Sequence, residues 1–196
     1  MSSAPQPESG FAPRTADWLA RWPGVGLAFL WGFAEGTLFF ILPDVLLSWV
    51  AMFRPRRALV HVAAMVLGAM LAGGVMFTWS AHSPQARQAV ARVPAVSAAM
   101  FIQAESDLQR HGVWGACAGP LRGIPYKVYA VEAPAHSMLW VFLAVTIPAR
   151  LWRFVVVWLG FAGAGVLLRK FGRSSFAPSL HLLFWVVTYA IYWATV

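Results

Sequence analysis

Charged residues interrupt two apolar stretches of this sequence, and they are of the types that bind anions or exchange protons. The first stretch contains Glu35 and Asp44 beside Gly36 and Pro43. The second contains two basic residues beside glycine and proline. A charged side chain near the centre of a bilayer costs about 2.5–3.5 kcal/mol on insertion scales, so such residues are usually functional. The candidates are, in chain order, Glu35, Asp44, Arg122, Lys127, Arg150 and Arg153.

The four basic candidates suit the binding of an anionic headgroup such as a phosphate. Arginine binds phosphate as a two-pronged fork, and lysine binds it as a point charge. The carboxylates of Glu35 and Asp44 are not needed for anion binding. We expect them to pair with the cations when no substrate is bound, or to take up and release protons. The alternative is that these charges form purely structural ion pairs or reach the membrane interface.

The composition indicates that these charges lie in a membrane protein. The chain has 196 residues, of which 60% are hydrophobic and only 11% charged, whereas a soluble domain carries about 25% charged residues. Its net charge is +8, and the basic residues stand at the ends of apolar segments. That placement fits the positive-inside rule and anionic lipids, not a nucleic-acid groove. We therefore expect an all-α membrane domain whose partners are membrane lipids and not nucleic acid.

The order of apolar segments predicts two interrupted hairpins and about three full spans. Residues 1–17 are expected to form a disordered tail, and residues 18–196 the membrane domain. The hairpins are expected to break at Gly36, Pro43, Gly123 and Pro125. The charges of an amphipathic helix over 83–112 are expected to form a solvated face. The remaining expected elements are an interfacial helix and re-entrant hairpin over 18–53, a transmembrane helix over 58–80, a second re-entrant hairpin over 113–136, and transmembrane helices over 137–168 and 179–196.

The basic loops predict how these segments are oriented. Residues 54–57 and 169–173 are both rich in arginine, so both are expected in the cytoplasm, together with the N-terminus. The two halves, each a hairpin plus a span, then have opposite orientations. The predicted fold is therefore a polytopic integral membrane protein with two opposed re-entrant hairpins in an inverted-repeat arrangement.

Two motifs at the interrupted stretches carry a family resemblance. Phe33-Ala34-Glu35 is followed by Pro43-Asp44, and the run from Gly112 to Gly115 is followed by Gly119-Pro-Leu-Arg-Gly-Ile-Pro125. These residues resemble the DedA family, whose shared core is called the VTT or SNARE-associated domain. The resemblance covers roughly Leu27 to Leu168. It implies two opposed re-entrant hairpins with accompanying spans, in agreement with the pattern above.

The resemblance also implies a function and a location. Some bacterial members of the family recycle undecaprenyl phosphate, eukaryotic relatives scramble phospholipids, and proton coupling is proposed. The chain is thus expected to translocate a lipid in the bacterial inner membrane. It departs from the family pattern at Tyr126-Lys127, where members commonly have a Gly-x-Arg context, and at Leu42-Pro43-Asp44, where Pro-Gly-Glu is common. It looks like a short, divergent member.

Two other classes of function are weighed against a transporter. A membrane phosphatase for lipid pyrophosphates also uses Glu and Arg in hairpins, but residues 112–131 contain no serine, threonine or histidine. An assembly or scaffold protein would use the small residues between Gly68 and Gly74 and the surface helix. We expect a non-enzymatic transporter without a metal or cofactor, because the five histidines are dispersed and Cys117 is the single cysteine. Whether it forms a homo-oligomer is left open.

Overall fold

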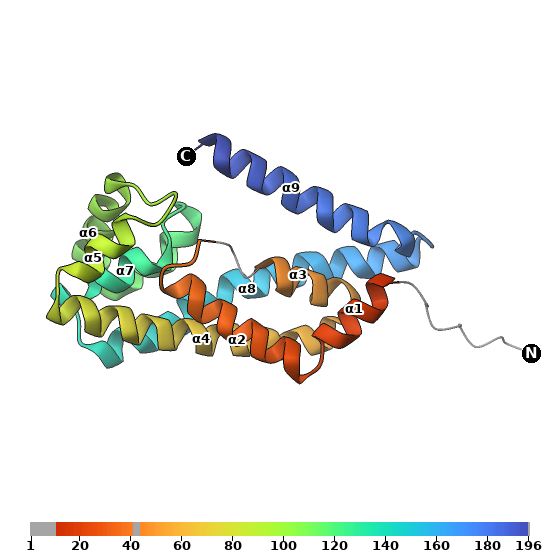
Figure 1. Cartoon of the computed structure of the whole chain (residues 1–196), viewed down its shortest axis with the longest axis horizontal. Helices are drawn as coiled ribbons and strands as arrows, with labels where there is room; N and C mark the ends of the chain where they lie inside the picture. Colours follow the sequence, from red (N-terminus) through yellow and green to blue (C-terminus); the bar gives the residue numbers. More distant parts are fainter. Residues whose placement is uncertain (1–10, 41–43, 196) are drawn as a thin grey trace, which may run out of the picture.

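The computed structural model describes residues 11–40 and 44–195, and within these ranges the chain forms helices without β-strands (Figure 1). The all-α prediction is therefore confirmed for the described residues. The elements are α1 (Phe11–Leu19), α2 (Trp22–Gly36), α3 (Asp44–Phe53), α4 (Pro55–His82), α5 (Gln85–Ala91), α6 (Ala98–His111), the 3₁₀ helix η1 (Gly112–Leu121), α7 (Tyr126–Glu132), η2 (Ala133–Ala135), α8 (Leu139–Lys170), η3 (Ser174–Phe176) and α9 (Ala177–Thr195).

Three helical segments are long and apolar enough to cross a membrane. They are Pro55–His82 with 28 residues, Leu139–Lys170 with 32 residues and Ser174–Ala194 with 21 residues. About 20 residues suffice to cross the hydrocarbon core at 1.5 Å per residue. α4 begins at Pro55, where the absent N–H of proline costs no helical hydrogen bond. α8 runs continuously through Pro148. The predicted number of full spans is thus present in length and composition.

The helices pack along one long axis, with α2 against α4 and α3 against α8 (Figure 1). Glycines allow the backbones of α2 and α4 to touch. A Cβ atom added at Gly32 would lie 2.5 Å from the carbonyl oxygen of Met65, and one at Gly68 would lie 2.2 Å from that of Phe29. Such small residues permit close helix approach when lipid offers no hydrophobic driving force.

α2 begins and α3 finishes at the same end of the bundle, where α1 also lies (Figure 1). The sequence predicts a disordered tail over residues 1–17, but α1 begins at Phe11. Ala12 and Ala16 of α1 are buried against Met52 and Phe53 of α3. This contact explains the difference, because two small apolar residues one helical turn apart give α1 a packing face.

The opposite end is formed by α5, α6, η1 and α7 around a second apolar core (Figure 1). The sequence predicts one amphipathic helix over 83–112, whereas the structure has α5 and α6 separated by residues 92–97. Pro94 lies in this link and accounts for the break, because proline lacks an N–H and disfavours a helical residue before it. Ala95 has a φ of 64°, which also ends the helical path.

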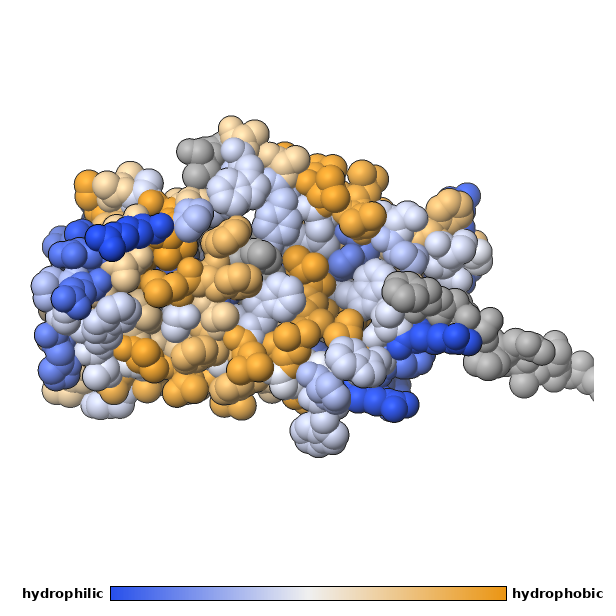
Figure 2. Space-filling view, in the orientation of Figure 1, coloured by the Kyte–Doolittle hydropathy of each residue, from blue (hydrophilic) through white to orange (hydrophobic). Residues whose placement is uncertain are grey.

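The outer surface reflects this axial arrangement. Figure 2 shows hydrophilic residues gathered at the two ends of the long axis and hydrophobic residues between them.

α9 diverges from α8 along its length (Figure 1) and is attached to α3 by a buried polar contact. Ser48 Oγ lies 2.9 Å from His181 Nε2, and it accepts a hydrogen bond of 2.9 Å from Trp185 Nε1.

The close contact of α2 and α4 generates a test with a matched control. Gly32→Ala is expected to lower the free energy of unfolding by about 1–3 kcal/mol, because its Cβ would overlap the backbone of Met65. Gly26→Ala lies in the same helix with nothing within 4 Å of an added Cβ, so its expected effect is neutral or stabilising. Thermal unfolding in detergent, followed by circular dichroism, compares the two variants. Equal stability of both variants would contradict the packing described.

Candidate functional site

Five of the six predicted charged residues meet in the centre of the molecule. Glu35 lies in the last turn of α2, Asp44 begins α3, Lys127 lies in α7, and Arg150 and Arg153 lie one turn apart in α8. Arg150 donates a hydrogen bond to Glu35, and Arg153 donates one to Asp44. Arg153 Nη1 also lies 3.9 Å from Glu35 Oε1. The cluster thus joins elements that are far apart in the sequence.

Lys127 is the cation of this cluster without a carboxylate partner. Its side chain is buried, and its ammonium donates a hydrogen bond of 2.5 Å to the carbonyl oxygen of Phe39. No ion pair within 4.0 Å joins Lys127 to a carboxylate in the described part of the chain. The cluster therefore contains three cations and two carboxylates, and it carries one excess positive charge.

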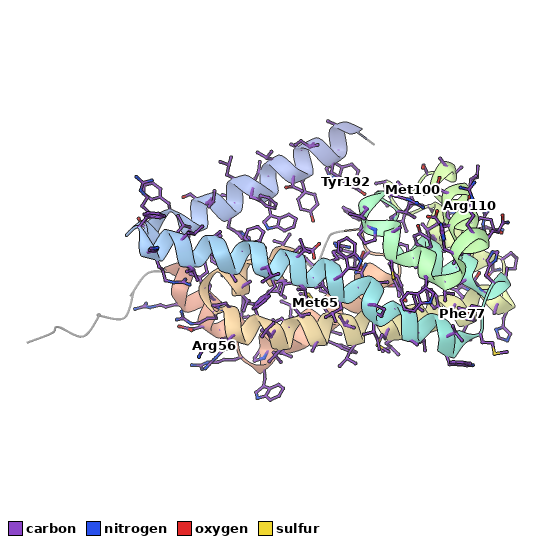
Figure 3. The ribbon with its side chains drawn as sticks, turned by 180° about the vertical axis from the view of Figure 1, so that it is seen from behind. Arg56, Met65, Phe77, Met100, Arg110 and Tyr192 are labelled. Atoms are coloured by element: carbon purple, nitrogen blue, oxygen red, sulfur yellow. The ribbon has the colours of Figure 1, made fainter. Side chains whose placement is uncertain are left out.

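A cavity of about 270 Å³ lies beside the cluster. Four of the charged residues line it: Glu35, Asp44, Lys127 and Arg153. The other walls come from Phe40, from the link between α5 and α6, from the link between η1 and α7, and from Tyr192 of α9. Figure 3 labels Tyr192 near the end of α9 that lies toward α6. The cavity is thus enclosed by both interrupted stretches.

Aromatic residues hold Arg150 in place. Its guanidinium carbon lies 5.3 Å from the ring centroid of Tyr126 and 5.1 Å from that of Phe154, within the range of cation–π contact. The Tyr126 hydroxyl is 2.7 Å from Thr146 Oγ1. Gly73 of α4 leaves room for this phenol, because a Cβ there would lie 2.0 Å from the hydroxyl oxygen. Arg150 is therefore held by two aromatic rings in addition to its ion pair.

Two buried atoms of the cluster retain unused hydrogen-bonding capacity. Asp44 Oδ1 and Arg150 Nε have no hydrogen-bond partner among the described residues. Buried polar atoms are ordinarily paired, so an unpaired one in a native protein requires an explanation. A polar group or water bound beside the cluster provides one. The arrangement can therefore accept an additional polar group, which would donate a hydrogen bond to the Asp44 oxygen or accept one from the Arg150 Nε–H.

Arg122, the sixth predicted site residue, lies away from the cavity. It follows η1, its side chain is 43% exposed, and it forms an ion pair with Asp107 of α6. Asp107 is buried and also accepts hydrogen bonds from Tyr129 at 2.7 Å and Gln103 at 3.0 Å. The prediction that the charges of residues 83–112 form a solvated face is therefore wrong for Asp107. The structure uses Arg122 to fasten η1 to α6.

The predicted break residues lie where helices end. α2 ends at Gly36, and Pro43 lies outside the described residues. Gly123 follows η1 with a φ of 70°, a left-handed conformation that favours glycine. Pro125 directly precedes α7, and both Gly123 and Pro125 line the cavity.

Sequence reasoning did not find several residues of the site. The roles of Tyr126 and Tyr192 depend on contacts between distant helices, and no local pattern indicates them. The burial of Asp107 does have a sequence signal. It lies on the same helical face as Ala104 and Leu108, both of which are buried.

Comparison of the chain with known proteins does not indicate a function. No protein-family model, no curated protein and no solved structure matches the chain. Among the described residues, no group of three or more His, Cys, Asp or Glu side chains is placed to hold a metal ion. What the structure defines is a helical chain with three segments long and apolar enough to cross a membrane, and a buried cluster of three basic and two acidic residues.

The ion pair of Arg150 and Glu35 generates a stability prediction. Arg150→Met is expected to lower the free energy of unfolding by about 3–5 kcal/mol, because it leaves a buried carboxylate without its main partner. The double variant Glu35→Gln/Arg150→Met removes both charges and should recover part of this loss. Arg110→Gln, at an exposed position of α6, serves as the control. Additive losses in the double variant, measured by thermal unfolding in detergent, would contradict the coupling.

The Asp107 cluster generates a pH prediction. Burial acts to raise the pKa of Asp107, but the hydrogen bonds from Arg122, Tyr129 and Gln103 outweigh it and hold this pKa below the ordinary 3.8. The ionised carboxylate therefore contributes stability above the unfolded pKa, and this contribution is lost as the pH falls through the folded pKa. The Tm difference between the wild type and Asp107→Asn should be constant near pH 6 and shrink below about pH 4.

Two outcomes would contradict this pH prediction. One is a Tm difference between wild type and Asp107→Asn that stays the same from pH 6 to pH 3. The other is an equally large effect of Asp17→Asn. Asp17 also has a lowered pKa because of its hydrogen bond from Arg54, but its side chain is 45% exposed, so solvent weakens its contribution.

Proposed function

We propose that this chain is a membrane transporter, a flippase or scramblase, that moves a lipid or lipid phosphate across the bilayer. The observation that carries the proposal is the buried cluster with one excess cation beside a cavity, enclosed by both interrupted stretches. A buried site with unbalanced positive charge suits an anionic phosphate headgroup. The apolar exterior between the two ends suits the acyl or prenyl chain of the same molecule (Figure 2).

The path of the chain supports two opposed re-entrant hairpins. α2 starts and α3 finishes at one end of the molecule, whereas η1 starts and α7 finishes toward the other end (Figure 1). The residues that follow α2 and η1 meet at the cavity. Broken helices that meet from opposite faces near the bilayer midplane are typical of inverted-repeat transporters. The resemblance of Phe33-Ala34-Glu35 and of residues 112–125 to the DedA family points the same way.

The contacts suggest how a headgroup binds. Lys127 and Arg153 both line the cavity, and a phosphate between them balances the excess charge. The Lys127 ammonium then exchanges the Phe39 carbonyl for a charged oxygen, which makes a stronger hydrogen bond. In this proposal Glu35 stays paired with Arg150. Asp44, the other carboxylate of the cavity, is the group that takes up and releases a proton. We further propose that transport is coupled to protons. We also propose that the protein lies in the bacterial inner membrane with a cytoplasmic N-terminus, because the basic loops 54–57 and 169–173 fit the positive-inside rule.

The cavity lining favours a transporter over the phosphatase alternative. Its described residues include no serine, threonine, histidine or cysteine to attack a phosphorus atom, and both of its carboxylates are paired with arginines. The lining also argues against a purely scaffolding role, because a scaffold gains nothing from an unpaired buried cation.

Transport by reconstituted protein tests the proposal. Proteoliposomes are assayed for the movement of a fluorescent phospholipid and of a polyprenyl phosphate. Lys127→Met keeps the volume of the side chain and removes its charge, so we expect transport to fall at least tenfold while the Tm changes little. Arg153→Met is expected to reduce transport similarly, with some loss of stability because it leaves Asp44 without its partner.

The matched control is Arg110→Gln, which removes an exposed charge that does not line the cavity. Its transport rate should equal that of the wild type. Wild-type transport in both Lys127→Met and Arg153→Met would remove the assigned site. Phosphate release from a lipid pyrophosphate, lost in the same variants, would favour the enzyme instead.

A further inference from the structure

The charges outside the cavity cluster are distributed unequally between the two ends of the molecule. The end formed by α5, α6, η1 and α7 is nearly balanced, with four basic and three acidic residues: Arg87, Arg92, Arg110 and Arg122 against Glu105, Asp107 and Glu132. The described part of the other end carries eight basic residues and one acidic residue, Asp17. The basic residues are Arg14, Arg21, Arg54, Arg56, Arg57, Arg169, Lys170 and Arg173.

The contacts at this basic end show that its charges form one surface. Arg54 donates two hydrogen bonds, of 2.5 and 2.8 Å, to the carboxylate of Asp17. The pKa of Asp17 is lowered by that bond first, and the charges of Arg57 and Arg21 act in the same direction. Arg21, Arg56 and Arg57 are exposed and have no hydrogen bond or ion pair of their side chains within the described residues.

The backbone beneath these arginines is fixed. His61 of α4 is fully buried, and its Nε2 lies 2.8 Å from the carbonyl oxygen of Leu19, at the turn between α1 and α2. Trp158 of α8 donates a hydrogen bond of 2.8 Å to the carbonyl oxygen of Pro55. Arg21 in the turn and Arg57 at the start of α4 therefore keep a constant relative position. Figure 3 shows Arg56 pointing away from the bundle at this end.

Exposed tryptophans accompany the arginines. Trp22 is 83% exposed and Trp18 is 56% exposed, and both flank Arg21 closely in the sequence. Exposure of an indole ring to water is unfavourable in free energy, whereas at the headgroup level of a bilayer the amphipathic ring is well solvated. Basic side chains beside interfacial tryptophans match the charge and the depth of an anionic lipid headgroup.

We propose that Arg21, Arg56 and Arg57, with Trp18 and Trp22, form a surface site for the headgroups of anionic lipids, separate from the transport cavity. Charge complementarity selects the occupant, because the described residues of this end include eight cations and one carboxylate, and Arg54 already pairs with that carboxylate. Each basic residue near an anionic leaflet contributes about fivefold in affinity. The site does not depend on the proposed transport function.

Lipid binding by the purified full chain tests the site. The probe is phosphatidylglycerol, titrated into neutral-detergent micelles and followed by native mass spectrometry, with phosphatidylcholine as the reference lipid. Arg21→Gln/Arg57→Gln is expected to weaken phosphatidylglycerol binding by tenfold or more, with phosphatidylcholine binding unchanged. Added NaCl should weaken the same binding in the wild type.

The matched control is Arg92→Gln/Arg110→Gln, which removes two exposed arginines at the opposite end. Its affinity for phosphatidylglycerol should stay within about twofold of wild type, because the positive and negative charges at this end nearly balance. Equal losses in both double variants, or equal affinity of the wild type for the two lipids, would overturn the surface site. Loss in Lys127→Met and not in Arg21→Gln/Arg57→Gln would place the lipid in the cavity, which overturns this inference while leaving the proposed function intact.

Discussion

The ion pair between Glu35 and Arg150 is the constraint on which the centre of the molecule depends. Removing two charges from water costs several kcal/mol each, and only close pairing in good geometry offsets that cost. The end of α2 therefore meets the middle of α8, where each side chain finds its partner. The second pair, Asp44 with Arg153 one turn further along α8, then fixes the start of α3. Together these pairs determine where the first interrupted stretch turns.

An additional cation distinguishes this cluster from a purely structural ion-pair network. A structural network is most stable when its charges balance, because an unpaired buried charge is costly. Here Lys127 is buried against a neutral carbonyl, and one oxygen of Asp44 and one nitrogen of Arg150 have no hydrogen-bond partner among residues 11–40 and 44–195. Such incomplete satisfaction beside a cavity is expected where a ligand completes the arrangement, as functional sites commonly sacrifice local stability.

The sequence predicts the elements of this structure better than their contacts. The long apolar segments predict the three spans because hydropathy acts on each segment separately. The convergence of Glu35 with Arg150 depends on residues more than a hundred positions apart, and the charge pattern indicates only that each needs a partner. Arg122 is an example of a contact that the sequence does not predict. Its motif predicts a residue of the transport site, whereas in the structure it forms an ion pair with the buried Asp107 of α6. The break between α5 and α6 is different, because Pro94 marks it locally.

The basic end and the central cluster are connected by the same two helices. Arg21 and Trp22 stand at the start of α2, whose last turn carries Glu35, and Arg54 directly follows α3, whose first residue is Asp44. α2 is held along α4 by backbone contacts at Gly32 and Gly68, which leave little freedom for sliding. A headgroup bound at Arg21 therefore contacts the start of α2, and the last turn of the same helix carries Glu35 of the cavity. α2 therefore joins the basic end of the molecule to the buried charges of the central cluster.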